Sequence, residues 1–130
     1  MQTPPCFYRV STKALITKEN KILLIMEPDG RWELPGGGLE VGESFESGIK
    51  REVNEELGVN AVKISKEPIY AWNLVTEDKP KLILCFEVEV DSFDFKGNPD
   101  ESEKIEFVTK DEMLKMNLHP NIKELPNRLA

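Results

Sequence analysis

Three glutamates lie close together in a helix-like stretch that follows a run of glycines. Glu52, Glu55 and Glu56 stand near the end of LPGGGLEVGESFESGIKREVNEELGV, which begins at Leu34. Hard oxygen ligands clustered in this way suit Mg²⁺ or Mn²⁺, ions that keep several waters and bind substrate phosphates. Arg51 is the neighbouring intrahelical cation, and one arginine cannot neutralise three acids. The pattern therefore points to metal-assisted chemistry on a phosphate compound.

A helix must position these acids, and its signals are local. Ser44 is the expected N-cap, Gly58 suits the position after the last turn, and an apolar residue recurs every fourth position at Phe45, Ile49, Val53 and Leu57. At roughly 100° per residue, Glu56 falls within that apolar stripe. A carboxylate there is costly unless it is paired or bound to metal. A solvated acidic helix face is the alternative, but it does not explain this position of Glu56.

The glycines at 36–38 are the second feature. Glycine permits positive φ and close backbone approach, so an amide or carbonyl can reach an ion or a phosphate. A plain turn is the alternative. The run is not a P-loop, because no Gly-Lys-Ser/Thr follows it.

Together, residues 37–59 resemble the Nudix box, Gly-x5-Glu-x7-Arg-Glu-U-x-Glu-Glu-x-Gly-U, where U is aliphatic. Every fixed position matches, at Gly37, Glu43, Arg51, Glu52, Val53, Glu55, Glu56, Gly58 and Val59. The resemblance implies an α+β fold, the Nudix-type α/β/α sandwich with a mixed β-sheet flanked by helices. It also implies hydrolysis of a nucleoside diphosphate linked to another group.

The resemblance further implies a site for Mg²⁺ or Mn²⁺. By position, Glu52 and Glu56 are the expected metal ligands, with the carbonyl of Gly36 adding a backbone oxygen. An acid outside the box often joins this site in the family, and Glu103 is our prediction for that ligand and for the general base. Glu55 is the rival base.

Other box residues receive supporting roles from the same resemblance. Arg51 is expected to orient Glu55, and Glu43 to brace the junction between loop and helix. Gly37 and Gly38 are expected to let the loop close over the pyrophosphate.

Two residues outside the box are predicted substrate contacts. Trp72 follows a predicted strand and precedes a charged turn, so we expect it to face the ligand. Asn121 resembles the base-reading asparagine of MutT-like enzymes, although capping a helix over 119–125 is the alternative. His119 is expected on the surface or as a cap.

The remaining elements are predicted from alternation, turns and prolines. Strands are expected at 7–17, 21–26, 31–34, 62–70, 82–90 and 105–108, and further helices at 111–116 and 119–125, the last stopped by Pro126. A turn is expected at Glu19-Asn20 and a loop at 92–102.

Bulk properties set wider limits. With 130 residues, 39% hydrophobic, we expect one domain over 1–130, located in the cytoplasm. The net charge of −7 argues against binding long nucleic acid, and no apolar run suits a membrane. Cys6 and Cys85 form no metal-binding pair; we expect one thiol near the terminus and one in a strand core. The chain is expected to be a monomer or homodimer.

The sequence thus predicts metal-dependent hydrolysis of a pyrophosphate bond, in a (d)NTP or modified nucleotide. The alternatives are an NDP-sugar, ADP-ribose or RNA 5′-end pyrophosphohydrolase, or a nucleotide-binding Nudix module without turnover.

Overall fold

The computed structural model describes residues 6–96 and 104–129. Its strands are Arg9–Leu15 (β1), Thr17–Lys18 (β2), Lys21–Met26 (β3), Trp32–Glu33 (β4), Gly36–Gly38 (β5), Ala61–Ile64 (β6), Tyr70–Thr76 (β7), Lys79–Val90 (β8) and Lys104–Val108 (β9). Its helices are Phe45–Leu57 (α1), Lys110–Met113 (α2), the 3-10 turn Pro120–Ile122 (η1) and Leu125–Arg128 (α3).

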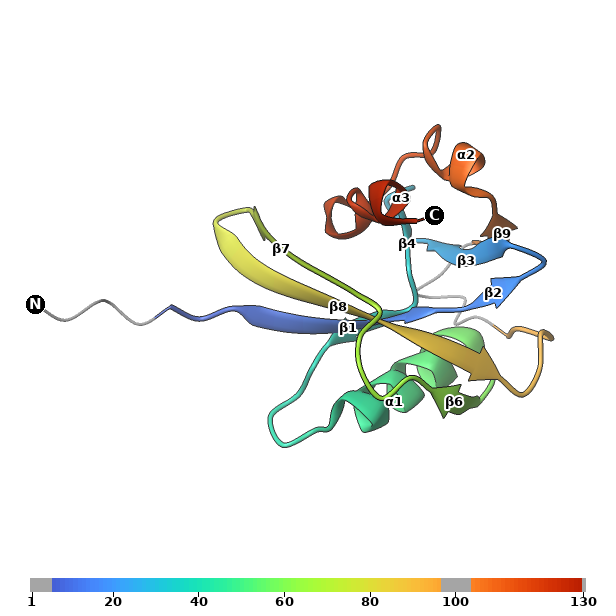
Figure 1. Cartoon of the computed structure of the whole chain (residues 1–130), viewed down its shortest axis with the longest axis horizontal. Coiled ribbons are helices and arrows are strands. Elements are labelled where there is room, and N and C mark those ends of the chain that lie inside the picture. The colour runs from blue at the N-terminus through green and yellow to red at the C-terminus, as the bar shows by residue number, and fades with distance from the viewer. Residues whose placement is uncertain (1–5, 97–103, 130) are drawn as a thin grey trace, which may run out of the picture.

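Two sheets form the middle of the molecule, between α1 on one side and the C-terminal helices on the other (Figure 1). The larger sheet has the order β5-β1-β8-β6, with β7 also paired to β8. Within it β1 and β8 are parallel, while the other pairs are antiparallel. The smaller, antiparallel sheet joins β2, β3, β4 and β9. This arrangement confirms the predicted α/β/α sandwich with a mixed sheet.

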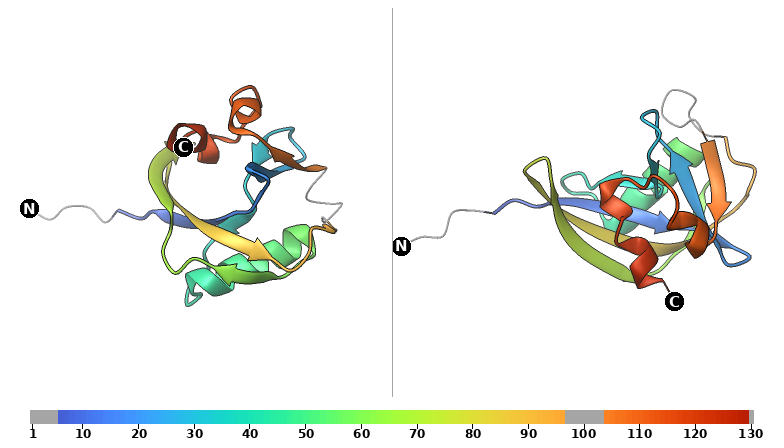
Figure 2. Two further views of the ribbon diagram at one scale, coloured as in Figure 1. Left: turned by 45° about the vertical axis from the view of Figure 1, so that its right-hand side comes forward. Right: turned by 90° about the horizontal axis from the view of Figure 1, so that it is seen from above.

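Alternation along the strands builds two cores, one against α1 and one against the C-terminal helices, and these helices lie on opposite sides of the sheets (Figure 2). Val10, Ala14 and Ile16 belong to the core under α1, whereas Leu15 belongs to the core under the C-terminal helices. Both faces of β1 are therefore covered, which explains why its last five residues are all buried.

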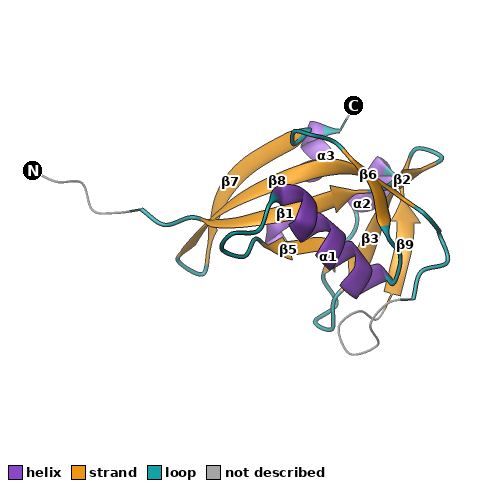
Figure 3. Cartoon of the chain, turned by 90° about the horizontal axis from the view of Figure 1, so that it is seen from below, coloured by secondary structure: helices purple, strands orange, loops and turns teal. Residues whose placement is uncertain are grey.

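Helix α1 lies across the face of the larger sheet (Figure 3). Ser44 caps it by accepting a hydrogen bond from the backbone N–H of Ser47, and Gly58 ends it with φ of 68°, so both predicted ends are confirmed. Ile49, Val53 and Leu57 are fully buried. The stripe weakens at its first member, because Phe45 is 41% exposed.

Several predicted elements differ from the structure. The glycine run is strand β5, antiparallel to β1, rather than a loop. The predicted strand 62–70 ends at Ile64, and the chain forms the β7–β8 hairpin from Tyr70 onward. The turn at Glu19-Asn20 is confirmed, with both residues at positive φ.

The predicted helix 119–125 is wrong. The chain instead makes the short turn η1, and Pro126 lies in the first turn of α3 rather than stopping a helix. Proline is tolerated there because the first N–H groups of a helix have no intrahelical partner. Among the described residues, no helix combines the length and apolar character needed to cross a bilayer.

Candidate metal and phosphate site

Strand β5 brings the glycines against the acidic face of α1. A Cβ on Gly37 would lie 2.7 Å from Oε1 of Glu52, so a side chain there would displace that carboxylate. The N–H of Gly36 donates a hydrogen bond to Oε1 of Glu56 at 3.1 Å. The local pairing of β5 with β1 therefore fixes where both glutamates meet the backbone.

Glu52 and Glu56 face each other on successive turns of α1. Burial raises the pKa of Glu56 well above its ordinary value, and the hydrogen bond with Glu52 raises it further. The ammonium of Lys13 and the N–H of Gly36 oppose this rise. The pair thus retains a proton that a bound cation would replace.

Arg51 joins two of the box acids by hydrogen bonds. Its guanidinium donates two hydrogen bonds to the carboxylate of Glu43, at 2.8 and 3.0 Å, and one to Oε1 of Glu52 at 2.8 Å. Glu43 also accepts from the N–H of Glu40, and these contacts lower the pKa of Glu43 to about 2. Glu43 therefore links the turn before the helix to its second turn, as the bracing role requires.

Of the two predicted bases, the structure describes only Glu55. Glu55 is 54% exposed, and its Oε2 lies 3.6 Å from Nη1 of Arg51, a longer contact than Arg51 makes with Glu43 or Glu52. Glu103 lies outside the described residues.

The structure brings together Trp72 and Asn121, two predicted substrate contacts. Trp72 is 5% exposed, and its indole N–H donates to the backbone carbonyl of Asn121 at 2.9 Å. The Asn121 side chain does not cap η1; that role belongs to His119, as the sequence allowed. Trp72 therefore has the contacts of a packing residue, and its stacking on a substrate stays a prediction.

Sequence reasoning missed a second polar network, on the other face of β1. Lys13 and Glu33 have side chains only 5% exposed, with Nζ and Oε2 separated by 3.6 Å. Glu33 also accepts from the side-chain N–H of Asn121 at 3.2 Å, and the Oδ1 of Asn121 accepts from Nζ of Lys81. The sequence did contain one sign of this network: Lys13 immediately precedes the apolar residues Ala14, Leu15 and Ile16 in a predicted strand.

A family model, the NUDIX domain, matches residues 7–129. The chain belongs to the Nudix family. A crystal structure of a MutT protein from Methanosarcina mazei Go1 superimposes with a TM-score of 0.81 at 27% identity, covering 93% of this chain and 91% of that one.

Two curated relatives match parts of this Nudix chain. An RNA pyrophosphohydrolase from Wolbachia pipientis wMel is 34% identical over 103 residues, 75% of this chain and 58% of the relative. A MutT-like protein from Streptomyces ambofaciens is 44% identical over 59 residues, 44% of this chain and 38% of the relative. The matched regions thus span less than two thirds of either relative.

The donor set at the Nudix box fits a hydrated divalent ion. Among residues 6–96 and 104–129, no group of three or more histidine, cysteine or acidic side chains could enclose a metal. Two carboxylates are nevertheless what Mg²⁺ and Mn²⁺ require when water and substrate phosphate fill the other positions. The carbonyl of Gly36, the third predicted ligand, lies 3.5 Å from Nζ of Lys13.

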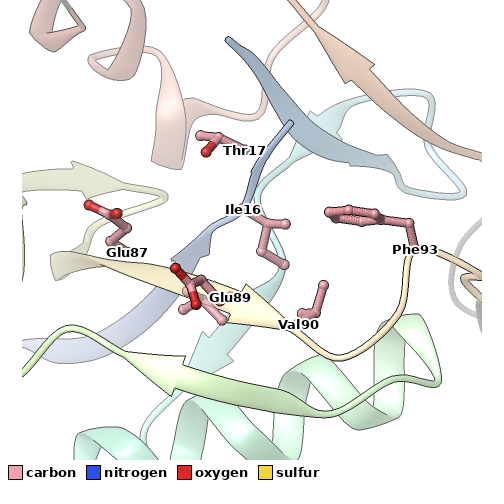
Figure 4. Close-up of a pocket in the computed structure, with 7 residues that line it drawn as sticks. Ile16, Thr17, Glu87, Glu89, Val90 and Phe93 are labelled. Carbon is pink, nitrogen blue, oxygen red and sulfur yellow. The ribbon is translucent and has the colours of Figure 1, made fainter. Parts of the chain in front are cut away.

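A cavity of about 300 Å³ lies elsewhere, where β1 passes into β2 beside the end of β8 (Figure 4). Ile16, Val90 and Phe93 give it apolar walls, and Glu87 and Glu89 line it with carboxylates. It includes no residue of the Nudix box and no predicted site residue.

Proposed function

We propose that this chain is a metal-dependent pyrophosphohydrolase acting on a nucleoside triphosphate or a modified nucleotide. The observation that carries the proposal is the Glu52–Glu56 pair, held against the backbone of Gly36 and Gly37. Two adjoining carboxylates on a half-buried helix face are unfavourable by themselves and become favourable around a cation.

Glu52 and Glu56 would hold the ion, with the carbonyl of Gly36 as a further oxygen. A bound Mg²⁺ or Mn²⁺ supplies charge neutralisation for the pyrophosphate and acidifies a bound water. The protein's own residues hold the carboxylates in place: Arg51 fixes Glu52, and Glu43 fixes Arg51.

Glu55 and Glu103 remain the two proposed bases that accept the proton of the attacking water. The exposure of Glu55 suits a group that must reach water, and its ion pair with Arg51 at 3.6 Å would orient its carboxylate. Gly37 and Gly38 are proposed to admit the pyrophosphate, since neither carries a side chain that would block it.

Trp72 and Asn121 are proposed to shape the substrate pocket. Both contact the network around Glu33 and Lys81, either directly or through each other. The name of one relative, an RNA pyrophosphohydrolase, supports a substrate that contains a pyrophosphate bond.

The test is release of phosphate or pyrophosphate by the full chain with Mg²⁺ or Mn²⁺. The panel contains nucleoside triphosphates, an oxidised triphosphate, RNA with a 5′-triphosphate, an NDP-sugar and ADP-ribose. Glu56→Gln should lower kcat by about a hundredfold or more, because it removes a charged ligand. Glu46→Gln is the matched control, since Glu46 lies on the exposed face of α1 and pairs with Lys50.

Activity that survives Glu56→Gln unchanged would contradict the proposed site. If the wild-type chain hydrolyses no member of the panel but binds one of them, the result would favour the alternative of a nucleotide-binding Nudix module without catalytic activity. Every box acid is present, which favours the enzyme.

A further inference from the structure

We propose that Arg9 and Lys81 bind the terminal phosphate of the substrate's polyphosphate chain. This inference rests on the proposed function and assigns two residues that lie outside the Nudix box. It is carried by three observations: their strand register, their hydrogen-bond acceptors and their position beside the glycine strand.

The strand register gives Arg9 and Lys81 neighbouring positions on one face of the sheet. Arg9 and Lys81 are direct partners in the parallel pairing of β1 with β8, so their side chains leave the same face of the sheet. Like charges opposite each other on neighbouring strands are destabilising. Within the described part of the chain, neither forms an ion pair with a carboxylate, although the protein has an excess of acids.

Neutral acceptors hold both side chains in place. Nζ of Lys81 donates to Oδ1 of Asn121 at 3.3 Å, and Asn121 is itself anchored on Glu33. Arg9 donates from Nη1 to the backbone carbonyl of Leu39 at 3.3 Å, leaving other N–H groups of its guanidinium available. Both cations are thus oriented without being neutralised, which is the property of an anion site.

The glycine strand β5 lies between the pair and the proposed metal site. The guanidinium of Arg9 lies against Gly38, where an added Cβ would collide with it. Gly38 is two residues from Gly36, whose N–H contacts Glu56, and β5 is the edge strand of its sheet. Arg9 and Lys81 lie on the face of the sheet opposite α1, so a polyphosphate that meets an ion at Glu56 would pass over the edge strand β5, whose glycines have no side chains, to reach Arg9.

The charge of the pair selects among substrates. An unesterified terminal phosphate carries about two negative charges near neutral pH, more than either phosphate of a diphosphate esterified at both ends. Two fixed cations therefore favour a chain that ends in a free phosphate, as in a nucleoside triphosphate or an RNA 5′-triphosphate. ADP-ribose and NDP-sugars have no such end.

The experiment compares Arg9→Gln, Lys81→Gln and the double variant with wild type. With Mg²⁺, each single variant should raise KM for a nucleoside triphosphate roughly tenfold, as expected for a lost charge-assisted hydrogen bond. KM for ADP-ribose should change less than about twofold. Arg9→Lys should recover part of the loss, and Arg128→Gln, which breaks an exposed pair with Glu124, should have no effect.

A second measurement does not depend on turnover. Calorimetric titration with inorganic tripolyphosphate should show about tenfold weaker binding for each variant, with unchanged melting temperatures as the check on folding. Equal losses for the triphosphate and ADP-ribose, or no loss for either, would overturn the proposal. A parallel titration with a short 5′-triphosphate RNA shows whether the pair binds the triphosphate of an RNA end or that of a free nucleotide more tightly. If no substrate is hydrolysed, the proposed function fails, and the tripolyphosphate result still decides this inference.

Discussion

Two polar networks lie on opposite faces of the β1–β5 pair. Carboxylates outnumber cations in one network, and cations outnumber carboxylates in the other. On the α1 face, Arg51 donates hydrogen bonds to the carboxylates of Glu43 and Glu52, and Glu52 is in turn hydrogen-bonded to Glu56. On the other face, the single carboxylate of Glu33 lies in a network with two lysines, one of them reached through Asn121.

This difference in charge distinguishes a structural ion pair from a group of carboxylates that would be stabilised by a bound cation. Lys13 and Glu33 neutralise each other in a buried position, so that ion pair needs no ligand. Arg51 donates a hydrogen bond to Glu52 and the N–H of Gly36 donates one to Glu56, while Lys13 acts on Glu56 only through its charge and is already paired with Glu33. One strand of glycines can serve both faces because it has no side chain on either.

The largest expected effect breaks the balanced network. Glu33→Gln should lower the free energy of unfolding by about 3 to 5 kcal/mol, because it leaves the Lys13 ammonium buried without a counter-charge. Urea unfolding followed by circular dichroism measures the change. Adding Lys13→Met should recover most of the loss, since a neutral buried pair replaces an uncompensated charge.

Glu56→Gln is the matched comparison on the other face. Without metal the Glu52–Glu56 pair retains a proton, so the substitution replaces a neutral carboxylic acid with a neutral amide, whose oxygen can still accept from the N–H of Gly36. The metal-free protein should therefore keep its stability, while Mn²⁺ should no longer raise its melting temperature. A loss as large as that of Glu33→Gln would show that both networks are structural.

A smaller effect is expected from Gly37→Ala. The new Cβ would lie 2.7 Å from Oε1 of Glu52, so the carboxylate must move away from β5. We expect kcat/KM to fall roughly tenfold, the size found when groups that orient a metal ligand are disturbed. Gly42→Ala is the control, because a Cβ there meets nothing within 4 Å although its φ is +81°. A greater loss of activity in the control would contradict this explanation.

Local signals predicted the acidic side of this site well. Ser44 and Gly58 set the ends of α1. The apolar residues at every fourth position of this helix predicted that Glu56 lies near the core, without any knowledge of tertiary contacts. A helix fixes the relative positions of residues four apart, so a motif within one helix carries its own geometry.

The cationic side depends on contacts that no local pattern contains. Lys13 of the larger sheet pairs with Glu33 of the smaller one, and Arg9 becomes a neighbour of Lys81 only through the parallel register of β1 and β8. The hairpin that buries Trp72 turns at Glu77-Asp78, both at positive φ, without the glycine that usually marks such a turn. The sequence therefore did not reveal that Trp72 is buried and bonded to the backbone of Asn121; its contact with a substrate stays a prediction.

The smallest expected effect tests whether the acidic network depends on the whole of α1. Ser44→Ala removes the side chain that caps the N-terminus and should lower the free energy of unfolding by about 1 kcal/mol. The Arg51 contacts begin two turns later and are anchored by Glu43, so the Mn²⁺-induced rise in melting temperature should keep its wild-type size. Chemical unfolding and melting curves with and without Mn²⁺ measure the two quantities on one sample. If the response to Mn²⁺ shrank along with stability, the first turn would also position the carboxylates, and the network could not be treated as independent of the cap.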